Sequence, residues 1–381
     1  MLKAVDRQAN PNYNDRHRKY QDSFPIIAAS VKALLVDVIS EMRIIVRTAI
    51  WLREPHSNHS HRRRRHMDIQ YLLFLQNFRN SINDALTPFM EMISLFAVTF
   101  LVIIPAMIYW CVDKESGLYT VASYTATIAV NAVVKLTACV YRPWIRDSRI
   151  LPAGDAISTA TGYSFPSGHT TMATSIYGSM AVSAWKKMRW VSVLCILLAL
   201  ITGFSRNYLG VHTPQDVAVG MTEGVLVIWG MRKLFGYLRQ NPEKENLFLA
   251  LGVILGIAAL FYISVKSYPM DYVDGKLLVD PKKMMKDGYG DIGAFMALCA
   301  GRFIEKTWVR FRPTCSRQNV VAALVGGVIT YGIIQILGGP MEALLGTHWG
   351  CFANNVIRIM FIIAIWPAVM KAALKDETVS A

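Results

Sequence analysis

The sequence predicts an all-α protein: a polytopic membrane helix bundle with a six-helix core and about three extra spans at the C-terminal end. Of the 381 residues, 53% are hydrophobic, a higher share than is usual for a soluble domain of this length. Apolar runs recur along the chain, and about 20 apolar residues suffice to cross a bilayer as a helix. No internal repeat divides the chain, so one membrane domain is the natural unit.

Nine apolar runs account for the predicted spans. The first six are residues 93–112, 118–140, 166–185, 190–207, 214–235 and 247–265. Three further runs follow them: 292–309, 320–337 and 351–373. From these runs we divide the chain into a basic N-terminal extension (1–66), a core with an interfacial helix (67–245) and a C-terminal transmembrane extension (246–381).

The N-terminal part is predicted to lie outside the bilayer. Residues 1–23 are polar and aperiodic, which is typical of disorder. Residues 24–52 are apolar but carry central charges, which favours a surface helix over a span. Residues 56–66 form a basic, histidine-rich linker. Apolar residues at helical spacing in 67–89 predict an amphipathic interfacial helix, so residues 1–66 are interpreted as an optional extension.

The net charge of +14 is better explained by membrane charge bias than by nucleic-acid binding, because the chain is built of hydrophobic spans. If nine spans alternate, the basic residues that follow the third, fifth, seventh and ninth spans share one side. That side is predicted to be cytoplasmic. The loops after the second and fourth spans, and the start of the third, then face the opposite side.

The polar stretch between the fourth and fifth spans, residues 205–216, carries the strongest chemical signal. Thr213 is suited to cap the following helix and Pro214 to occupy its first position. Asp216 then falls in the first turn, near enough to His212 to accept from one ring nitrogen. A carboxylate so placed fixes the tautomer and leaves the other nitrogen able to attack. Arg206 supplies a planar fork of donors suited to phosphate oxygens.

Two further stretches end up on the same predicted side. Lys135 and Arg142 lie at the outer end of the second span, where the plain alternative is that both face lipid headgroups. Before the third span, Ser167 and Gly168 precede His169. The free N–H groups at the start of that helix suit an anion, and His169 is placed to protonate a leaving oxygen. A single histidine at a helix start is more often structural. His169 therefore supports a catalytic site only in combination with the other two stretches.

Together these residues resemble the three-part signature of the type-2 phosphatidic acid phosphatase superfamily. Its parts are Lys135-x6-Arg142-Pro143, Pro166-Ser167-Gly168-His169 and Ser205-Arg206-x5-His212-x3-Asp216. The likeness covers about residues 67–235 and implies a phosphatase-like core and a phosphohistidine mechanism with no metal or other cofactor. It implies His212 as nucleophile, Asp216 as its orienter and His169 as general acid. The implied phosphate-binding groups are Lys135, Arg142, Ser167, Gly168 and Arg206.

The layout is similar to glucose-6-phosphatase and to sphingosine-phosphate phosphatases. Because the site is predicted to open at the level of the lipid headgroups, we expect an integral-membrane phosphatase that hydrolyses a lipid phosphomonoester or diphosphate. Its active site is expected to lie at the non-cytoplasmic face of a bacterial plasma membrane or of an endoplasmic reticulum. Its expected partners are that substrate and membrane lipids, with no nucleic acid.

Three alternatives stay open: a soluble sugar phosphate as substrate, a transporter that uses these polar residues as an ion path, or a metal site at His169, His212 and Asp216.

Residues outside the signature allow two readings each. Glu223 either lines the cavity or pairs with a buried polar group, and Gly220 and Gly224 have the spacing of a helix contact. The charged residues 146–149 either contact a headgroup or are solvated, and Arg358 has Glu305 as a possible partner. The outer loop 267–290 is a candidate cap over the site.

Overall fold

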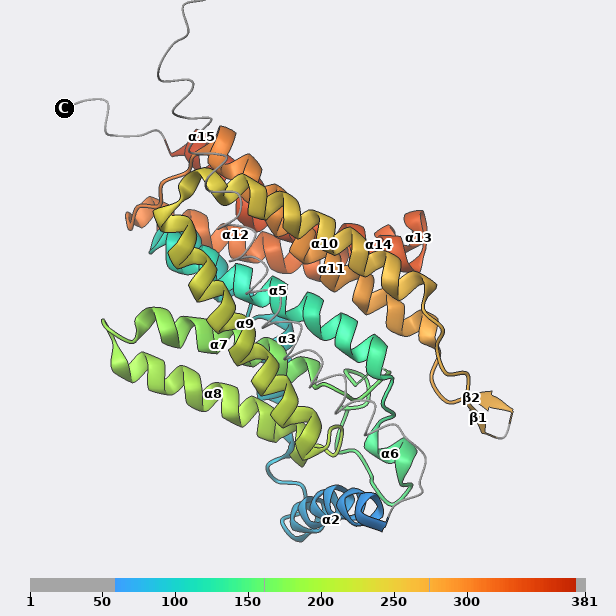
Figure 1. The fold of residues 1–381 in the computed structure, drawn as a ribbon. Coiled ribbons are helices and arrows are strands. Elements are labelled where there is room, and N and C mark those ends of the chain that lie inside the picture. Colours follow the sequence, from blue (N-terminus) through green and yellow to red (C-terminus); the bar gives the residue numbers. More distant parts are fainter. Residues whose placement is uncertain (1–58, 161, 274, 375–381) are drawn as a thin grey trace, which may run out of the picture. The chain divides into compact units, whose positions relative to one another are not determined.

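The computed structural model describes residues 59–160, 162–273 and 275–374, and α-helices make up most of them (Figure 1). These residues all belong to one compact unit, Arg53–Ala381. The predicted disordered segment 1–23 and the predicted surface helix in 24–52 lie outside the described residues. The backbone of 59–66, predicted to be part of a linker, is helical.

The helices and the single hairpin follow one another along the chain. From the start of the described residues to residue 240 they are α2 (His59–Ser81), α3 (Thr87–Thr99), α4 (Ile103–Cys111), α5 (Lys114–Ala138), α6 (Pro143–Arg146), α7 (Gly168–Ala184), α8 (Arg189–Tyr208) and α9 (Pro214–Gln240). Then come η1 (Pro242–Lys244), α10 (Glu245–Val265), β1 (Tyr272–Val273), β2 (Lys276–Leu277), α11 (Pro281–Ile304), η2 (Glu305–Val309), α12 (Arg317–Ile336), α13 (Gly338–Leu345), α14 (Thr347–Met360), η3 (Phe361–Ile365) and α15 (Trp366–Ala373). The strands β1 and β2 are antiparallel, with Tyr272 opposite Leu277.

A helix occurs at each of the nine predicted spans, but not every one is long and apolar enough to cross a membrane by itself. Within the described residues five helical stretches are, or six when the bent pair α3–α4 is counted as one span. Those that do not qualify are α7, which has only 17 residues, and α9 and α11, which carry several charged residues. The chain is an all-α polytopic membrane bundle in which the most polar helices surround the site described below.

Two N-terminal boundaries differ from the prediction. Helix α2 ends at Ser81 because Asn83 and Asp84 adopt positive φ angles of 49° and 57°, so Phe89 belongs to α3 instead. The first predicted span therefore begins at Thr87 and is bent by 50° between α3 and α4. Pro105, in the first turn of α4, has no N–H to continue the α3 hydrogen-bond ladder, which accounts for the break.

A third difference concerns α11, which begins at Pro281 instead of at residue 292. Asp280 caps its first turn by accepting from the backbone N–H of Lys282 at 2.9 Å. Much of the predicted outer loop 267–290 is thus the β1–β2 hairpin and the first turns of α11. The charged residues that made this segment look like a loop lie in the first turns of α11, and one of them, Asp287, lines the site described below.

Helix α5 runs through the middle of the described bundle, beside α7, α9 and α11 (Figure 1). Helices α7 and α9 approach each other closely at two glycines. A Cβ on Gly220 would lie 3.0 Å from the Ser167 carbonyl oxygen, and one on Gly224 would lie 2.8 Å from Thr174 Cγ2. The predicted helix contact at Gly220 and Gly224 is confirmed, and it fixes the first turn of α7 against α9.

We expect Gly224→Leu to destabilise the protein, because the new side chain would collide with Thr174 across the α7–α9 contact. Overpacking of this kind costs about 1–3 kcal/mol. The matched control is Gly230→Leu on the same helix, where an added Cβ meets nothing within 4 Å. The measurement is the thermal unfolding midpoint of the two purified variants in one detergent. Equal midpoints for Gly224→Leu and Gly230→Leu would contradict a tight α7–α9 contact.

Candidate active site

A cavity of about 400 Å³ lies where the C-terminal end of α5, the N-terminal end of α7 and the loop between α8 and α9 meet. Its lining includes five of the eight residues predicted for the site: Lys135, Arg142, Gly168, His169 and His212. The other three, Ser167, Arg206 and Asp216, are buried but are not part of that lining. The three sequence stretches therefore converge, and their members divide into those that face the cavity and those behind it.

Local capping chemistry fixes the segment that follows His212. Thr213 Oγ1 accepts from the Asp216 N–H at 3.3 Å, and Asp216 Oδ2 accepts from the Thr213 N–H at 2.8 Å, which is a capping box. Pro214 occupies the first helical position, as predicted. Asn207 holds the other side of the turn by donating to the His212 carbonyl oxygen at 2.9 Å. These bonds set the position of the His212 ring relative to the Asp216 carboxylate.

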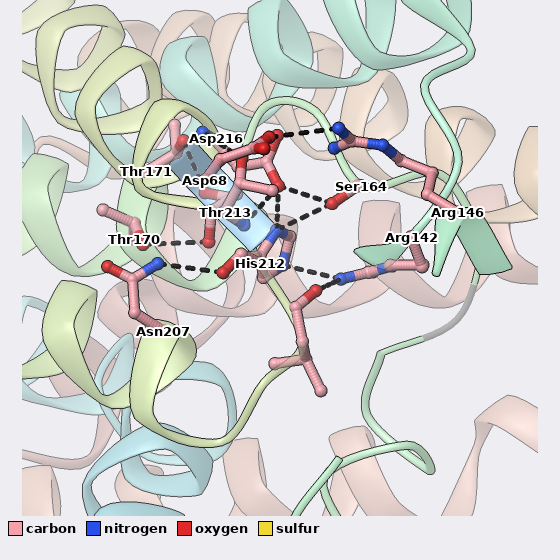
Figure 2. A network of polar contacts seen from close by, with 12 residues as sticks. Asp68, Arg142, Arg146, Ser164, Thr170, Thr171, Asn207, His212, Thr213 and Asp216 are labelled. Carbon is pink, nitrogen blue, oxygen red and sulfur yellow. Dashed lines mark hydrogen bonds and ion pairs between the residues drawn. The ribbon is translucent and has the colours of Figure 1, made fainter. Parts of the chain in front are cut away.

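The two nitrogens of His212 meet different partners (Figure 2). Nδ1 lies 3.5 Å from both Asp216 Oδ2 and Ser164 Oγ, and Ser164 Oγ donates to the same carboxylate oxygen at 2.5 Å. Nε2 lies 2.7 Å from Arg142 Nη1. A guanidinium only donates, so Nε2 is the acceptor and Nδ1 carries the proton. In this tautomer the lone pair is on Nε2, where it accepts the hydrogen bond from Arg142.

His212 lies between α8 and α9 and is only 1% exposed. Burial, followed by the nearby positive charge of Arg142, lowers the pKa of His212 well below its usual value. The ring is therefore neutral at neutral pH, which is the state a nucleophilic imidazole requires.

Arg142 is held inside the protein and does not face lipid headgroups, contrary to the plain alternative for this stretch. It is 3% exposed, and it donates through Nε to the Gly162 carbonyl and through Nη1 to the Val211 carbonyl, each at 3.0 Å. Lys135 lies in the last turn of α5, and a Cβ on Gly168 would be 3.4 Å from its Nζ. Both cations thus lie beside the start of α7.

The start of α7 differs in one respect from the predicted anion seat. The Ser167 N–H is not directed at the cavity but donates to the Asp216 carbonyl oxygen at 3.0 Å. The Ser167 hydroxyl is also engaged, accepting from Thr170 Oγ1 at 2.8 Å. Ser167 therefore joins α7 to α9, and contact with an anion falls to the backbone that begins at Gly168. We assign the difference to a long-range pairing that sequence spacing does not reveal.

His169 and Arg206 both keep unused polar atoms. His169 lines the cavity, is 9% exposed, and its Nε2 has no hydrogen-bond partner in the described part of the chain. Arg206 is 1% exposed and donates through Nη1 to Ser94 Oγ, whereas its Nε and Nη2 have no partner among residues 59–160, 162–273 and 275–374. Unpaired donors on a buried guanidinium are costly, so this arrangement fits a site that takes an anion.

Ser164, two residues before Pro166, is a residue of this site to which the sequence analysis gave no role. Another is Asn131, which lines the cavity from α5 and donates to Glu223 Oε2 at 3.0 Å and to Thr171 Oγ1 at 3.1 Å. Glu223 thus pairs with a buried polar group, which is the second of its two predicted roles. It does not line the cavity.

The remaining charged residues have structural partners. Arg146 pairs with Asp68 of α2 at 3.0 Å (Figure 2), and Arg149 pairs with Asp147 at 2.7 Å. Arg358 donates to Asn355, and its possible pairing with Glu305 does not occur in the described residues. Glu305 instead accepts from Lys114 at 2.5 Å and from Arg302 at 2.6 Å.

The PAP2 superfamily model matches residues 116–240, from the first turn of α5 to the end of α9. The chain carries a PAP2 superfamily domain. Every residue predicted for the site falls inside it.

Three curated relatives show how far the similarity extends. Phosphatidylglycerophosphatase B of Bacillus subtilis (strain 168) is 28% identical over 160 residues, which is 40% of this chain and 73% of that protein. Undecaprenyl-diphosphatase of Sulfolobus acidocaldarius is 29% identical over 111 residues, 29% of this chain and 51% of that protein. Phosphatidylglycerophosphatase B of Escherichia coli (strain K12) is 35% identical over 96 residues, 23% of this chain and 35% of that protein. No solved structure gives a significant match.

Proposed function

We propose that this protein is an integral-membrane phosphatase that hydrolyses a lipid phosphomonoester or diphosphate through a phosphohistidine intermediate. The observation that carries the proposal is that His169 and His212, from different helix junctions, line one cavity together with Lys135 and Arg142. The PAP2 domain and the names of its relatives, which are phosphatases of lipid phosphates, support the substrate class.

The first chemical step joins His212 to phosphorus. Nε2 attacks, an N–P bond forms and the P–O bond to the leaving group breaks, while His169, which enters this step as an imidazolium, gives a proton to the departing oxygen and becomes neutral. The Nδ1 proton of His212 faces Asp216, which balances the positive charge that develops on the ring. Arg142 now donates to Nε2. Phosphate oxygens are stronger acceptors for that guanidinium, so substrate binding would free the Nε2 lone pair.

The second step hydrolyses the phosphohistidine and regenerates free His212. Water attacks phosphorus, the N–P bond breaks, and His169 takes the proton that water loses, so that inorganic phosphate and the starting protonation state result. Throughout both steps the charge on the phosphoryl oxygens is met by Lys135, Arg142 and the N-terminal end of α7. Arg206 contributes as a nearby positive charge behind the cavity. No metal has a role in this scheme.

The predicted topology supports a site on the non-cytoplasmic face. Helices α7 and α9 both begin at the cavity, so their C-terminal ends lie at the opposite end of the bundle. The basic residues Lys186, Lys187 and Arg189 follow α7, and Arg239 and Lys244 close α9 and the turn after it. By the positive-inside rule that end is cytoplasmic, which puts the site on the other face of the membrane.

The test of this function is phosphate release by the purified full-length protein in nanodiscs. The panel contains a phosphatidylglycerophosphate, a polyprenyl diphosphate and a soluble sugar phosphate, each with and without a chelator. We expect release from at least one lipid and the same rate with chelator. Release from the sugar phosphate alone would favour the soluble substrate. Activity lost with chelator and regained with zinc would favour the metal reading, and no release with any substrate would refute the proposal.

Ser164→Ala should lower kcat/KM roughly 10- to 100-fold. The reason is that hydrogen bonds to charged groups are worth about 1.5–3 kcal/mol, and Ser164 helps hold the carboxylate that orients His212. Ser158→Ala is the matched control, since that exposed hydroxyl bonds only within its own turn, to Asp155. If the two variants were equally active, Ser164 would have no part in positioning the catalytic histidine.

A further inference from the structure

The cavity has a second wall, built by the part of the chain that follows the PAP2 domain. Helices α11 and α14 contribute Asp287, Asp291, Cys351 and Asn355 to the same lining that holds the two histidines. Asp287 and Asp291 are four residues apart on one helix, so they share a face. Asp287 is exposed and Asp291, one turn further into the bundle, is partly buried. One carboxylate therefore lies nearer the mouth of the cavity and the other nearer its interior.

This wall is close to the phosphate-binding side. Helix α11 meets α5 at Gly288, where an added Cβ would lie 2.8 Å from Leu136 Cδ1. Leu136 is the neighbour of Lys135, and both α11 carboxylates lie near enough to attract the Lys135 ammonium. Asp291 also has Arg358 of α14 as an electrostatic neighbour. The cavity thus has basic side chains on the α5–α7 side and acidic side chains on the α11 side.

An independent feature points to a ligand between the two walls. The His169 ring projects into the cavity, is 9% exposed, and its Nε2 has no hydrogen-bond partner in the described residues. A buried polar atom without a partner is uncommon, and a ligand oxygen would satisfy it. With the phosphate on the basic side, a leaving group that extends past His169 would reach the acidic side.

Carboxylates accept hydrogen bonds and repel anions, so they discriminate among leaving groups. A second phosphate placed beside them would meet like charge. Hydroxyl or ammonium groups would each find an acceptor. An unsubstituted alkyl chain would displace water from the carboxylates and offer them no hydrogen bond in return.

We propose that Asp287 and Asp291 are specificity-determining residues that select phosphomonoesters whose leaving group bears hydroxyl or ammonium donors beside the ester oxygen, against diphosphates. This inference rests on the phosphatase function proposed above and narrows its substrate. It also assigns a task to the C-terminal helices, which lie outside the matched domain: they complete the pocket for the leaving group.

The experiment compares four substrates of equal chain length in nanodiscs: a long-chain 2-amino-alkyl phosphate, a 2-hydroxy-alkyl phosphate, the plain alkyl phosphate and the plain alkyl diphosphate. Wild type should have the highest kcat/KM on the first two. In the variant D287N/D291N, kcat/KM for these two should fall about 10- to 100-fold, more for the ammonium than for the hydroxyl. The plain alkyl phosphate should change little, and the diphosphate should improve.

The control variant is Glu342→Gln, which neutralises a carboxylate of α13 that pairs with Lys286 outside the cavity. It should keep the wild-type order of substrates. If D287N/D291N does not fold, the single variants Asp287→Asn and Asp291→Asn replace it, and the wild-type order is itself a test.

The outcomes separate the two proposals. No release by wild type from any of the four substrates would argue against the phosphatase function. Release without preference for donor-bearing substrates, or an equal loss on all four in the variants, would overturn the role of the α11 carboxylates alone.

Discussion

Replacing His212 with alanine should abolish phosphate release, with a fall in kcat of roughly 10⁴-fold or more, as expected when a nucleophile is removed. In wild type the ring is buried, kept neutral by its surroundings, and oriented through Nδ1 by Asp216 and Ser164. No other described histidine apart from His169 lines the cavity, and His169 has no carboxylate partner of this kind among the described residues.

The decisive measurement is covalent trapping. Wild type incubated with a ³²P-labelled lipid phosphate and quenched in base should retain label on His212, and acid should remove it, since phosphohistidine is acid-labile. His212→Ala should retain none. The matched control is His348→Ala, because His348 bonds to the Lys282 carbonyl outside the cavity. Undiminished release by His212→Ala, or label that persists on the variant, would show that another group is the nucleophile.

The sequence predicted the parts of the site that depend on local chemistry. The cap of α9 by Thr213, the proline at its first position and the placement of Asp216 beside His212 involve neighbours within four residues, so spacing alone predicts them. A helix contact at Gly220 and Gly224 was also predicted from the spacing of small residues one turn apart, and the structure identifies α7 as the helix that packs there. These short-range features are sufficient to bring His212 and Asp216 together.

The convergence of the three stretches was predicted, but individual hydrogen bonds and helix boundaries that depend on distant segments were not. The Ser167 N–H is used by the Asp216 carbonyl, and nothing in the spacing of either stretch indicates this. The start of α11 was misplaced because Lys286, Asp287 and Asp291 suggest a solvated loop, whereas two of them face an internal cavity. Polar residues on a membrane helix break the hydrophobic pattern at the positions where they serve a site.

Replacing His169 with asparagine should produce a loss that depends on the leaving group. His169 is proposed to protonate the departing oxygen, and general acid catalysis contributes about 10²- to 10⁴-fold. An alkyl alcohol is a poor leaving group and needs that proton, so His169→Asn should lose activity on an alkyl phosphate over this range. A nitrophenyl phosphate releases a stable phenolate without assistance, so the first step with this substrate should lose far less.

The same variant should also slow the second step, the hydrolysis of phosphohistidine. Because His169 is proposed to take the proton from the attacking water, the phosphohistidine formed from nitrophenyl phosphate should persist in His169→Asn and give a burst of about one nitrophenolate per active site. His212→Ala is the comparison, since loss of the nucleophile should slow both substrates equally and give no burst. Equal losses of His169→Asn on the alkyl and aryl substrates, with no burst, would mean that His169 binds phosphate but transfers no proton.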